Sequence, residues 1–203
     1  FDINSAGKIT VIKGASALQY GGDAIGGIVI IEPEMVKKDT LLGKTLVNLS
    51  SNGNGGSVTT SLIKGNTLGW NYQLNATYKY LGDRETPNYV LSNSGNREQN
   101  FSGNVGYATE KYSLNGFYSF YNAQIGIIKA SHIGNVNDLY ESITNQSPSV
   151  IEQFTYNLEE PKQEVQHHLA KLDFQKWFSD DTNIDVQYAF QFNNRQEFDV
   201  RRN

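Results

Sequence analysis

The most regular pattern in this 203-residue chain is the alternation of apolar and polar side chains over residues 70–80. The even positions carry Trp, Tyr, Leu, Ala, Tyr and Tyr, whereas the odd positions carry Asn, Gln, Asn, Thr and Lys. Side chains of a β-strand point alternately to its two faces, so a period of two predicts a strand with one apolar and one polar face. The same alternation recurs over residues 182–194. The sequence therefore predicts an all-β chain.

Weaker forms of the pattern predict five further strands, which makes seven in all. They are expected at residues 44–51, 57–63, 101–107, 112–122 and 164–178. After the first hairpin the connections alternate between short ones and long ones, of which the longest covers residues 125–163. Outer-membrane barrels sort their loops in this way, with tight turns at one end and long loops at the other. A β-sandwich has no reason to do so, although a soluble sandwich stays open as an alternative.

The predicted strands assign each aromatic residue to a face. In a transmembrane antiparallel β-barrel the apolar faces contact lipid and the polar faces line the lumen. Aromatic residues near strand ends would lie at the headgroup levels of the membrane. The predicted lipid-facing and girdle residues are Trp70, Tyr72, Tyr78, Tyr80, Tyr112, Tyr118, Phe120, Trp177, Tyr188 and Phe190.

Composition excludes or disfavours several classes of structure and function. Although 38% of the residues are hydrophobic, no apolar run approaches the roughly 18 residues that a membrane helix needs. There is no cysteine, which excludes disulfides and cysteine metal sites. With a net charge of −4 and no basic cluster larger than Arg201-Arg202, nothing indicates nucleic-acid binding.

Neither metal nor catalytic chemistry is indicated. The adjacent His167 and His168 point to opposite faces of a strand, so they do not chelate one ion easily. By alternation, His168 is expected to face outward and His167 inward. No Ser/His/Asp order, carboxylate pair or nucleotide loop is present. The sequence therefore predicts no enzyme, no metal site and no cofactor.

A glycine-rich stretch, KITVIKGASALQYGGDAIGGIVIIE, covers residues 8–32. Two β-branched runs enclose a small-residue patch and two glycine pairs, which indicates tight turns or a backbone close to another surface. An ordinary glycine-rich hairpin is the simpler alternative. The pattern is carried by Lys13, Gly14, Ser16, Leu18, Tyr20, Gly21, Ala24, Ile25, Gly26 and Gly27.

In this order, these residues resemble the end of the plug domain in TonB-dependent outer-membrane receptors. Lys13 stands where arginine is commoner, and the proline that often follows Gly14 is absent. The segments NYVLSNSGNREQNFSGNVGY and PKQEVQHHLAKL resemble the first third of the barrel in Bacteroidetes-type receptors of the iron-chelate and haem branch. The resemblance implies the C-terminal part of a plug at residues 1–32 and a linker at 33–42. Residues 43–203 would then form the first seven or so strands of a roughly 22-stranded barrel.

The resemblance also implies a function, namely energy-coupled uptake of a scarce nutrient through the outer membrane of a bacterial cell. The nutrient would be an iron chelate, such as a siderophore or ferric citrate, or haem. The other partners would be outer-membrane lipid, an accessory lipoprotein and the TonB complex, which acts on a part of the receptor outside these residues. A passive porin or structural barrel and a soluble β-rich binding module are the alternative functions.

Two further expectations concern the loops and the glycines. Loop length together with aromatic or charged content predicts ligand contacts at Arg84, Tyr89, Gln124, Lys129, His132 and Asn135. The glycine pairs would approach a barrel wall so closely that side chains at Gly21, Gly26 or Gly27 would collide with it. A chain that starts at Phe1, without the N-terminal box of such receptors, is further expected to be a fragment.

Overall fold

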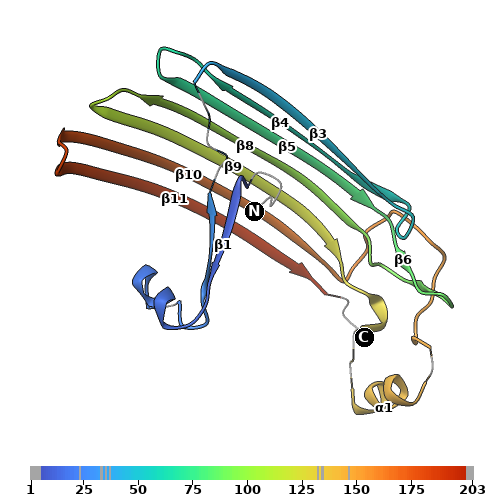
Figure 1. Cartoon of the computed structure of the whole chain (residues 1–203). Coiled ribbons are helices and arrows are strands. Elements are labelled where there is room, and N and C mark those ends of the chain that lie inside the picture. Colours follow the sequence, from blue (N-terminus) through green and yellow to red (C-terminus); the bar gives the residue numbers. More distant parts are fainter. Residues whose placement is uncertain are drawn as a thin grey trace.

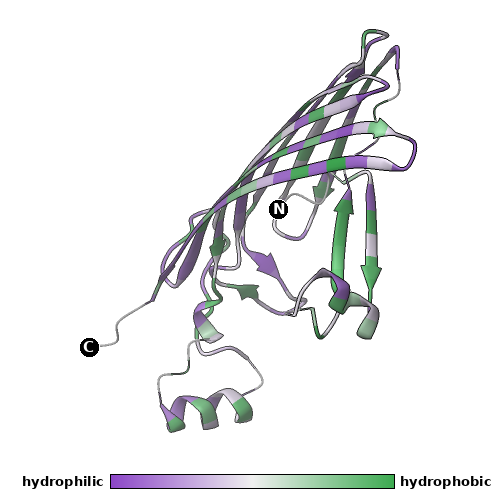
Figure 2. Cartoon of the chain, turned by 90° about the vertical axis from the view of Figure 1, so that its left-hand side faces the viewer, coloured by the Kyte–Doolittle hydropathy of each residue, from purple (hydrophilic) through white to green (hydrophobic). Residues whose placement is uncertain are grey.

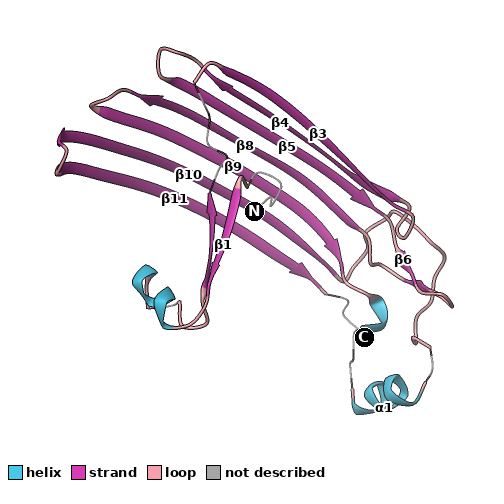
Figure 3. Cartoon of the chain, viewed as in Figure 1, coloured by secondary structure: helices cyan, strands magenta, loops and turns pink. Residues whose placement is uncertain are grey.

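A computed structural model describes residues 6–22, 24–32, 34, 36, 38–131, 133, 135–145 and 147–199. Most of them lie in antiparallel β-sheets, of which the largest has seven strands (Figures 1 and 3). Its strands are β3 (Thr40–Ser50), β4 (Gly55–Gly65), β5 (Trp70–Leu81), β8 (Asn96–Ala108), β9 (Tyr112–Gly126), β10 (Lys162–Ser179) and β11 (Thr182–Phe198). All seven predicted strands are confirmed.

The seven-stranded sheet is a meander with the order β11-β10-β9-β8-β5-β4-β3. Each strand is antiparallel to its neighbours, and the ladders run with almost no interruption, as in the twelve-residue pairing of β5 with β8. Among the described strands, β3 and β11 pair on one side only. The sheet is therefore open at both edges.

Smaller elements flank this sheet. The strands β1 (Lys8–Ile12) and β2 (Ile28–Glu32) form a separate hairpin, with a 3-10 helix over Ala15–Tyr20 in its connection. The connection from β5 to β8 contains a second small hairpin, formed by β6 (Arg84–Glu85) and β7 (Val90–Leu91). The long connection from β9 to β10 holds a 3-10 turn (Lys129–Ser131) and the helix α1 (Val136–Thr144). No helix in the described part of the chain is long and apolar enough to cross a membrane.

Several strands extend beyond their predicted bounds. The strand β3 begins at Thr40, inside the predicted linker, because Leu41 and Leu42 continue the ladder opposite Lys64 and Ile63 of β4. The linker is therefore shorter than the predicted residues 33–42. The strand β9 also extends beyond its predicted end and continues to Gly126. It therefore includes Gln124, which the sequence places in a loop.

In the strands β4, β5 and β8, the burial of side chains is inverted relative to a soluble protein. Along β5, Leu74 is 46% exposed, whereas its neighbour Gln73 is 4% exposed. Figure 2 shows the resulting alternation of hydrophobic and hydrophilic residues along the strands. The buried hydrophobic residues in the described part of the chain are Ala17, Ala24, Ile63, Leu81 and Ala123. The buried side chains of the described residues are therefore mainly polar.

The buried face is held together by polar side chains. The hydroxyls of Thr59 and Thr77 lie 2.9 Å apart, and Asn75 Nδ2 donates to Ser102 Oγ at 3.2 Å. Where β5 meets β8, Lys79 and Glu98 form an ion pair of 2.9 Å. Hydrogen bonding lowers the cost of burying such groups, which explains how a polar face can be buried. We call this side of the sheet the polar face and the other side the outward face.

The connections divide between the two ends of the sheet. The short turns β4–β5, β8–β9 and β10–β11 form one end, which we call the turn end. Residues 82–95 and 127–161 form the connections at the other end, the loop end. The β3–β4 turn belongs to the loop end as well, because Gly82 N donates to Gly53 O at 2.8 Å.

Candidate functional site

The outward face carries an apolar band. On β8, β9, β10 and β11, one row of register partners on this face consists of aromatic rings, namely Phe101, Phe120, His168 and Phe192. On the same four strands the next row toward the loop end consists of side-chain amides, namely Gln99, Asn122, Gln166 and Asn194. On β5 the apolar residues extend further, through Tyr78 to Tyr80. Along β11 the apolar residues run from Ile184 to Phe192, which is about 20 Å for a strand tilted by roughly 40°. A lipid-facing band is about 25 Å tall.

Nine of the ten predicted lipid-facing aromatics lie on this outward face by strand register. The prediction for Trp177 is wrong, because it follows Asp173 and Gln175 at two-residue intervals and so alternates onto the polar face. Phe178 takes the outward position instead, where Lys176 Nζ lies 4.8 Å from its ring centre. The alternation of the sequence alone would have placed Trp177 on the polar face, because the bulge begins only after this residue.

The two histidines face opposite sides, as predicted. His168 lies on the outward face, where its Nδ1 is 2.8 Å from the hydroxyl of Tyr118 and its ring contacts Phe120. His167 lies on the polar face, level with Tyr121 and Asn193. Within the described residues, no three His, Asp or Glu side chains converge on a position that could hold a metal ion.

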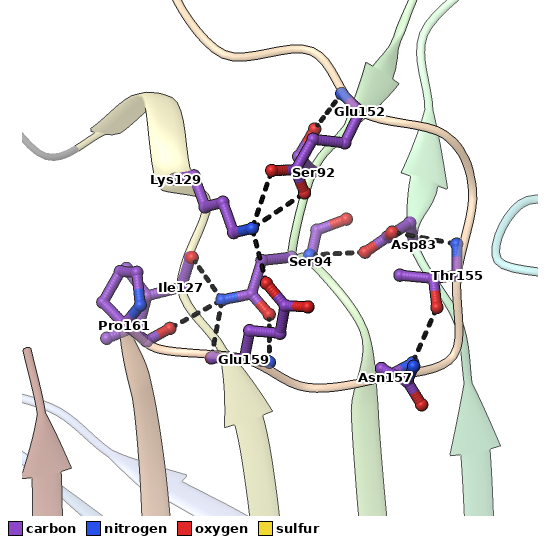
Figure 4. A network of polar contacts seen from close by, with 11 residues as sticks. Asp83, Ser92, Ser94, Ile127, Lys129, Glu152, Thr155, Asn157, Glu159 and Pro161 are labelled. Atoms are coloured by element: carbon purple, nitrogen blue, oxygen red, sulfur yellow. Dashed lines mark hydrogen bonds and ion pairs between the residues drawn. The ribbon is translucent and has the colours of Figure 1, made fainter. Parts of the chain in front are cut away.

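At the loop end, residues 152–161 cross the ends of several strands, and we call this segment the strap (Figure 4). Asp83, which is 1% exposed, anchors it. The Asp83 carboxylate accepts from the backbone N–H of Thr155 at 3.1 Å and of Ser94 at 2.9 Å. Asp83 N in turn donates to Thr155 O at 3.0 Å. The strap therefore pairs with the first residues after β5, more than seventy positions earlier in the chain.

Asn93 makes a second anchor, and it is 3% exposed. Its Nδ2 lies 3.0, 3.0 and 2.7 Å from the carbonyl oxygens of Ile127, Glu159 and Pro161, to which it donates. Its Oδ1 accepts from Glu159 N at 2.9 Å. The backbone of Asn93 has a φ of 65°, a left-handed conformation that asparagine tolerates better than most residues. One side chain thus joins the β7–β8 connection to both ends of the long loop.

Glycines let the strap lie close to the strands. A Cβ on Gly82 would lie 2.6 Å from the ring of Phe154, and a Cβ on Gly95 would lie 3.0 Å from Leu158 Cδ2. Between them, the ring of Tyr156 stacks on Tyr80 at 5.2 Å. The strap therefore covers Tyr80 at the loop end of the outward face.

Lys129 joins the strap from the other side of the long loop. Its Nζ lies 2.8 Å from a carboxylate oxygen of Glu152 and 2.6 Å from one of Glu159. The hydrogen bonds that Lys129 donates, first to Glu152 and then to Glu159, raise the pKa of Lys129 above its ordinary value of 10.5. The lysine therefore stays charged at physiological pH and stabilises the two acidic ends of the strap.

The predicted ligand-contact residues do not converge on one site. Lys129 is held in the ion pairs just described, and Asn135 caps α1 by accepting from Asn137 N and Asp138 N. Gln124 lies in β9 and donates to Glu164 at 3.3 Å, so its placement in a contact loop is wrong.

The other three predicted contact residues differ in their surroundings. Arg84 is exposed in β6. Tyr89 lines a shallow cavity of about 340 Å³ together with Ser131, Ser142 and Ser149. His132 lies outside the described residues.

The glycine-rich stretch forms the hairpin that its two apolar runs predict. A series of turns joins its strands, with Ala17 N donating to Gly14 O, Ala24 N to Gly21 O and Gly27 N to Ala24 O. Only Gly27 of the expected three glycines is crowded, since a Cβ there would lie 2.6 Å from Ile12 O of the same hairpin.

The expected collision with a wall is therefore not found within the described residues. A Cβ on Gly21 or Gly26 would meet nothing within 4 Å, and Gly21 is required for its φ of 136° instead. The segments that flank the hairpin do approach the sheet. Ala6 and Glu34 line a cavity of about 240 Å³ with Lys44, Gln73 and other polar-face residues of β3 to β5.

Sequence reasoning missed Asp83, Asn93 and the strap. The Asn-Ser-Gly run at residues 93–95 is a turn signal, which agrees with the left-handed backbone of Asn93. The partners of both side chains lie far along the chain, and no local pattern encodes them.

A scan against protein-family models finds no match, and a search of the curated proteins finds no relative. The two faces of the sheet and the loop end therefore carry the functional assignment.

Proposed function

We propose that the seven-stranded sheet is part of an outer-membrane β-barrel, with its outward face in lipid and its polar face lining the lumen. The inverted burial of the sheet carries this proposal. Exposing apolar surface to water costs roughly 25 cal/mol per Å², so rows of bare Phe, Tyr, Leu and Val side chains would strongly favour aggregation in water. In a membrane barrel the same apolar side chains would contact lipid instead of water, so this cost would not arise.

The height of the apolar band supports a lipid-facing surface. For a strand tilted by roughly 40°, the band along β11 covers about 20 Å of membrane depth, which is close to the band of about 25 Å on membrane barrels. Beyond the band the outward side chains become polar, as from Phe120 to Asn122 along β9, which fits the passage from lipid to the headgroup level.

The segments that flank the hairpin support a gated transporter over an open porin. They lie on the polar face, which in a barrel is the lumen side. A plug there would fill the channel. Together with the resemblance of residues 8–32 to a plug end, this supports a TonB-dependent receptor that takes up an iron chelate or haem.

A paired labelling experiment tests the membrane assignment. Spin labels would be attached to cysteine at Phe190 or at Gln191 in the full-length protein in outer membranes, since both positions are exposed on β11. We expect the label at Phe190 to collide with dissolved oxygen, which concentrates in lipid, and the label at Gln191 to collide with a water-soluble nickel chelate. Equal access of the nickel chelate to both labels would contradict the proposal.

Transport is tested separately in cells that depend on the protein for iron. We expect uptake of a radiolabelled ferric siderophore, ferric citrate or haem, and we expect a protonophore to stop it. Uptake that continues at the same rate after the proton gradient has collapsed would favour the passive porin. Calorimetry with the same three ligands on the purified protein would identify the nutrient class.

A further inference from the structure

The cavity of about 240 Å³ on the polar face lies between the sheet and the segments that flank the β1–β2 hairpin. Its floor belongs to β3, β4 and β5, where cross-strand partners form neighbouring rows. The two rows nearest the turn end consist of Leu42, Ile63 and Gln73, followed by Lys44, Ser61 and Asn75. Ala6, just before β1, and Glu34, just after β2, line the cavity from the hairpin side. Two separate parts of the chain therefore enclose it.

The floor contains a buried amide without a partner. Gln73 is 4% exposed, and its side chain forms no hydrogen bond with any described residue. The neighbouring polar side chains differ, because Asn75 donates to Ser102 at 3.2 Å and the Thr59 hydroxyl lies 2.9 Å from that of Thr77. An unpaired buried amide destabilises the fold, so such groups normally find a partner. For Gln73 that partner has to come from the cavity that it lines.

Two opposite charges meet the same cavity from its two sides. Lys44 belongs to the floor and Glu34 to the hairpin side. Neither forms an ion pair with a described residue. A ligand that carries both a carboxylate and an ammonium group would use both side chains, whereas an anion or a cation would use only one. The charges therefore favour a zwitterion.

Apolar side chains interrupt the polar face at this place. Leu42 and Leu46 are exposed on the cavity side of β3, next to Ile63 of β4. On β5, by contrast, the same face carries only polar side chains from Asn71 to Lys79. The exposed leucines favour a ligand with an apolar group. The cavity is smaller than the roughly 300–1,000 Å³ of sites for drug-sized molecules, which excludes haem or a siderophore.

We propose that this cavity binds an α-amino acid with an aliphatic side chain, such as leucine. The ligand carboxylate pairs with Lys44, its ammonium group pairs with Glu34, and its side chain contacts Leu42 and Leu46. Gln73 completes the site by hydrogen bonding to the polar end of the ligand. The bound amino acid joins the flank of the hairpin to the sheet. All these residues are described, so the proposal depends neither on the membrane assignment nor on iron uptake.

Binding of L-leucine to the purified full-length protein is the first test. Equilibrium dialysis with the radiolabelled amino acid should show saturable binding with a Kd below about 1 mM. Leucinamide lacks the carboxylate, 4-methylpentanoate lacks the ammonium group and glycine lacks the side chain. We expect each of the three to bind at least fivefold more weakly than L-leucine in competition. These comparisons need no variant, so they hold even where a substitution prevents assembly.

Matched pairs of variant and ligand form the second test. Lys44→Gln should weaken L-leucine at least fivefold but leave leucinamide unchanged, because leucinamide has no carboxylate for the lysine to bind. Glu34→Gln should likewise weaken L-leucine but not 4-methylpentanoate. Gln73→Leu, which removes the hydrogen-bonding groups, should weaken L-leucine at least fivefold. Lys64→Gln is the control, since Lys64 follows Ile63 onto the outward face of β4, and it should change nothing.

Four results would overturn the proposal. They are the absence of saturable binding to normally assembled protein, as for a cavity that holds only water, and equal affinities for L-leucine and leucinamide. The other two are L-leucine binding that all three cavity variants leave unchanged, and a loss with Lys64→Gln as large as with Lys44→Gln. A failed transport assay for iron chelates would leave the amino-acid site untouched, so the two proposals fail separately.

Discussion

Asn93 is the side chain on which the loop end depends most. Replacing it with Ala removes the donor to three carbonyls and the acceptor for Glu159 N, all at a site that is 3% exposed. Unsatisfied buried groups cost about 1–3 kcal/mol, so we expect Asn93→Ala to release the strap. Limited proteolysis of the membrane-assembled protein should then cut within residues 127–161 at least tenfold faster.

Two comparisons make this test specific. Asn88→Ala changes an exposed asparagine in the same connection and should leave the cleavage rate unchanged. Asn93→Asp keeps an oxygen acceptor but loses the amide donor, so its cleavage rate should also rise. Equal protease resistance of all three variants and the unchanged protein would mean that the strap is held by its aromatic contacts alone.

Lys129 predicts how the strap responds to pH. The pKa of its ammonium is raised above 10.5 by Glu152 and Glu159, so folding favours the protonated form. The resulting stabilisation is fully present below the ordinary pKa and is lost as the pH rises through the raised one. Each exposed pair contributes about 0–1 kcal/mol, so the change should be gradual.

The expected result is constant protease resistance of the strap up to about pH 10 and faster cleavage above it. The strap of Lys129→Met should be cleaved faster at neutral pH, and its cleavage rate should no longer increase at high pH. Lys111→Met, which changes an exposed lysine at the turn end, should keep it. A rise of the same size in both variants would assign the effect to other groups.

At the scale of elements, the sequence predicts the strands better than it predicts their contacts. Alternation identified all seven strands of the sheet, because one face of each is apolar and the other polar along its length. The ends of the strands were predicted less well. Thr40 and Gln124 belong to strands because they pair with β4 and β10, which the local sequence does not indicate. The strap could not be predicted, because Asp83 and Thr155 meet only through the fold.

The β1–β2 hairpin gives a prediction with a built-in control. Gly27 has a φ of 125° and lies against Ile12 O, whereas neighbouring Gly26 has open space around it. Gly27→Val should therefore disrupt the hairpin, at a cost of about 1–2 kcal/mol from the backbone alone, and Gly26→Val should not. The measurement is the amount of assembled, heat-modifiable protein in the outer membrane. A loss with Gly26→Val as large as with Gly27→Val would instead indicate contact with a surface beyond the described residues.

At the scale of the whole molecule, the open edges of the sheet limit what residues 1–203 can do alone. Along the free edges of β3 and β11, backbone N–H and C=O groups have no strand partner among the described residues. Each unpaired group costs several kcal/mol in lipid, whereas a closed barrel has no such edge. Burying the apolar band in a membrane would thus also bury two rows of unpaired N–H and C=O groups.

We therefore expect residues 1–203, expressed alone, to remain outside the membrane or to associate at their edges. The test is refolding into liposomes, followed by protease treatment and measurement of the mass of any protected species. Adding the remaining strands of a barrel in the same chain should give a protected, heat-modifiable monomer. A protected monomer of residues 1–203 alone would contradict the need for further strands, because seven strands would then have closed their edges by themselves. A protected oligomer would show that copies of the chain can pair β3 with β11, so that closure requires only a partner edge and not a longer chain.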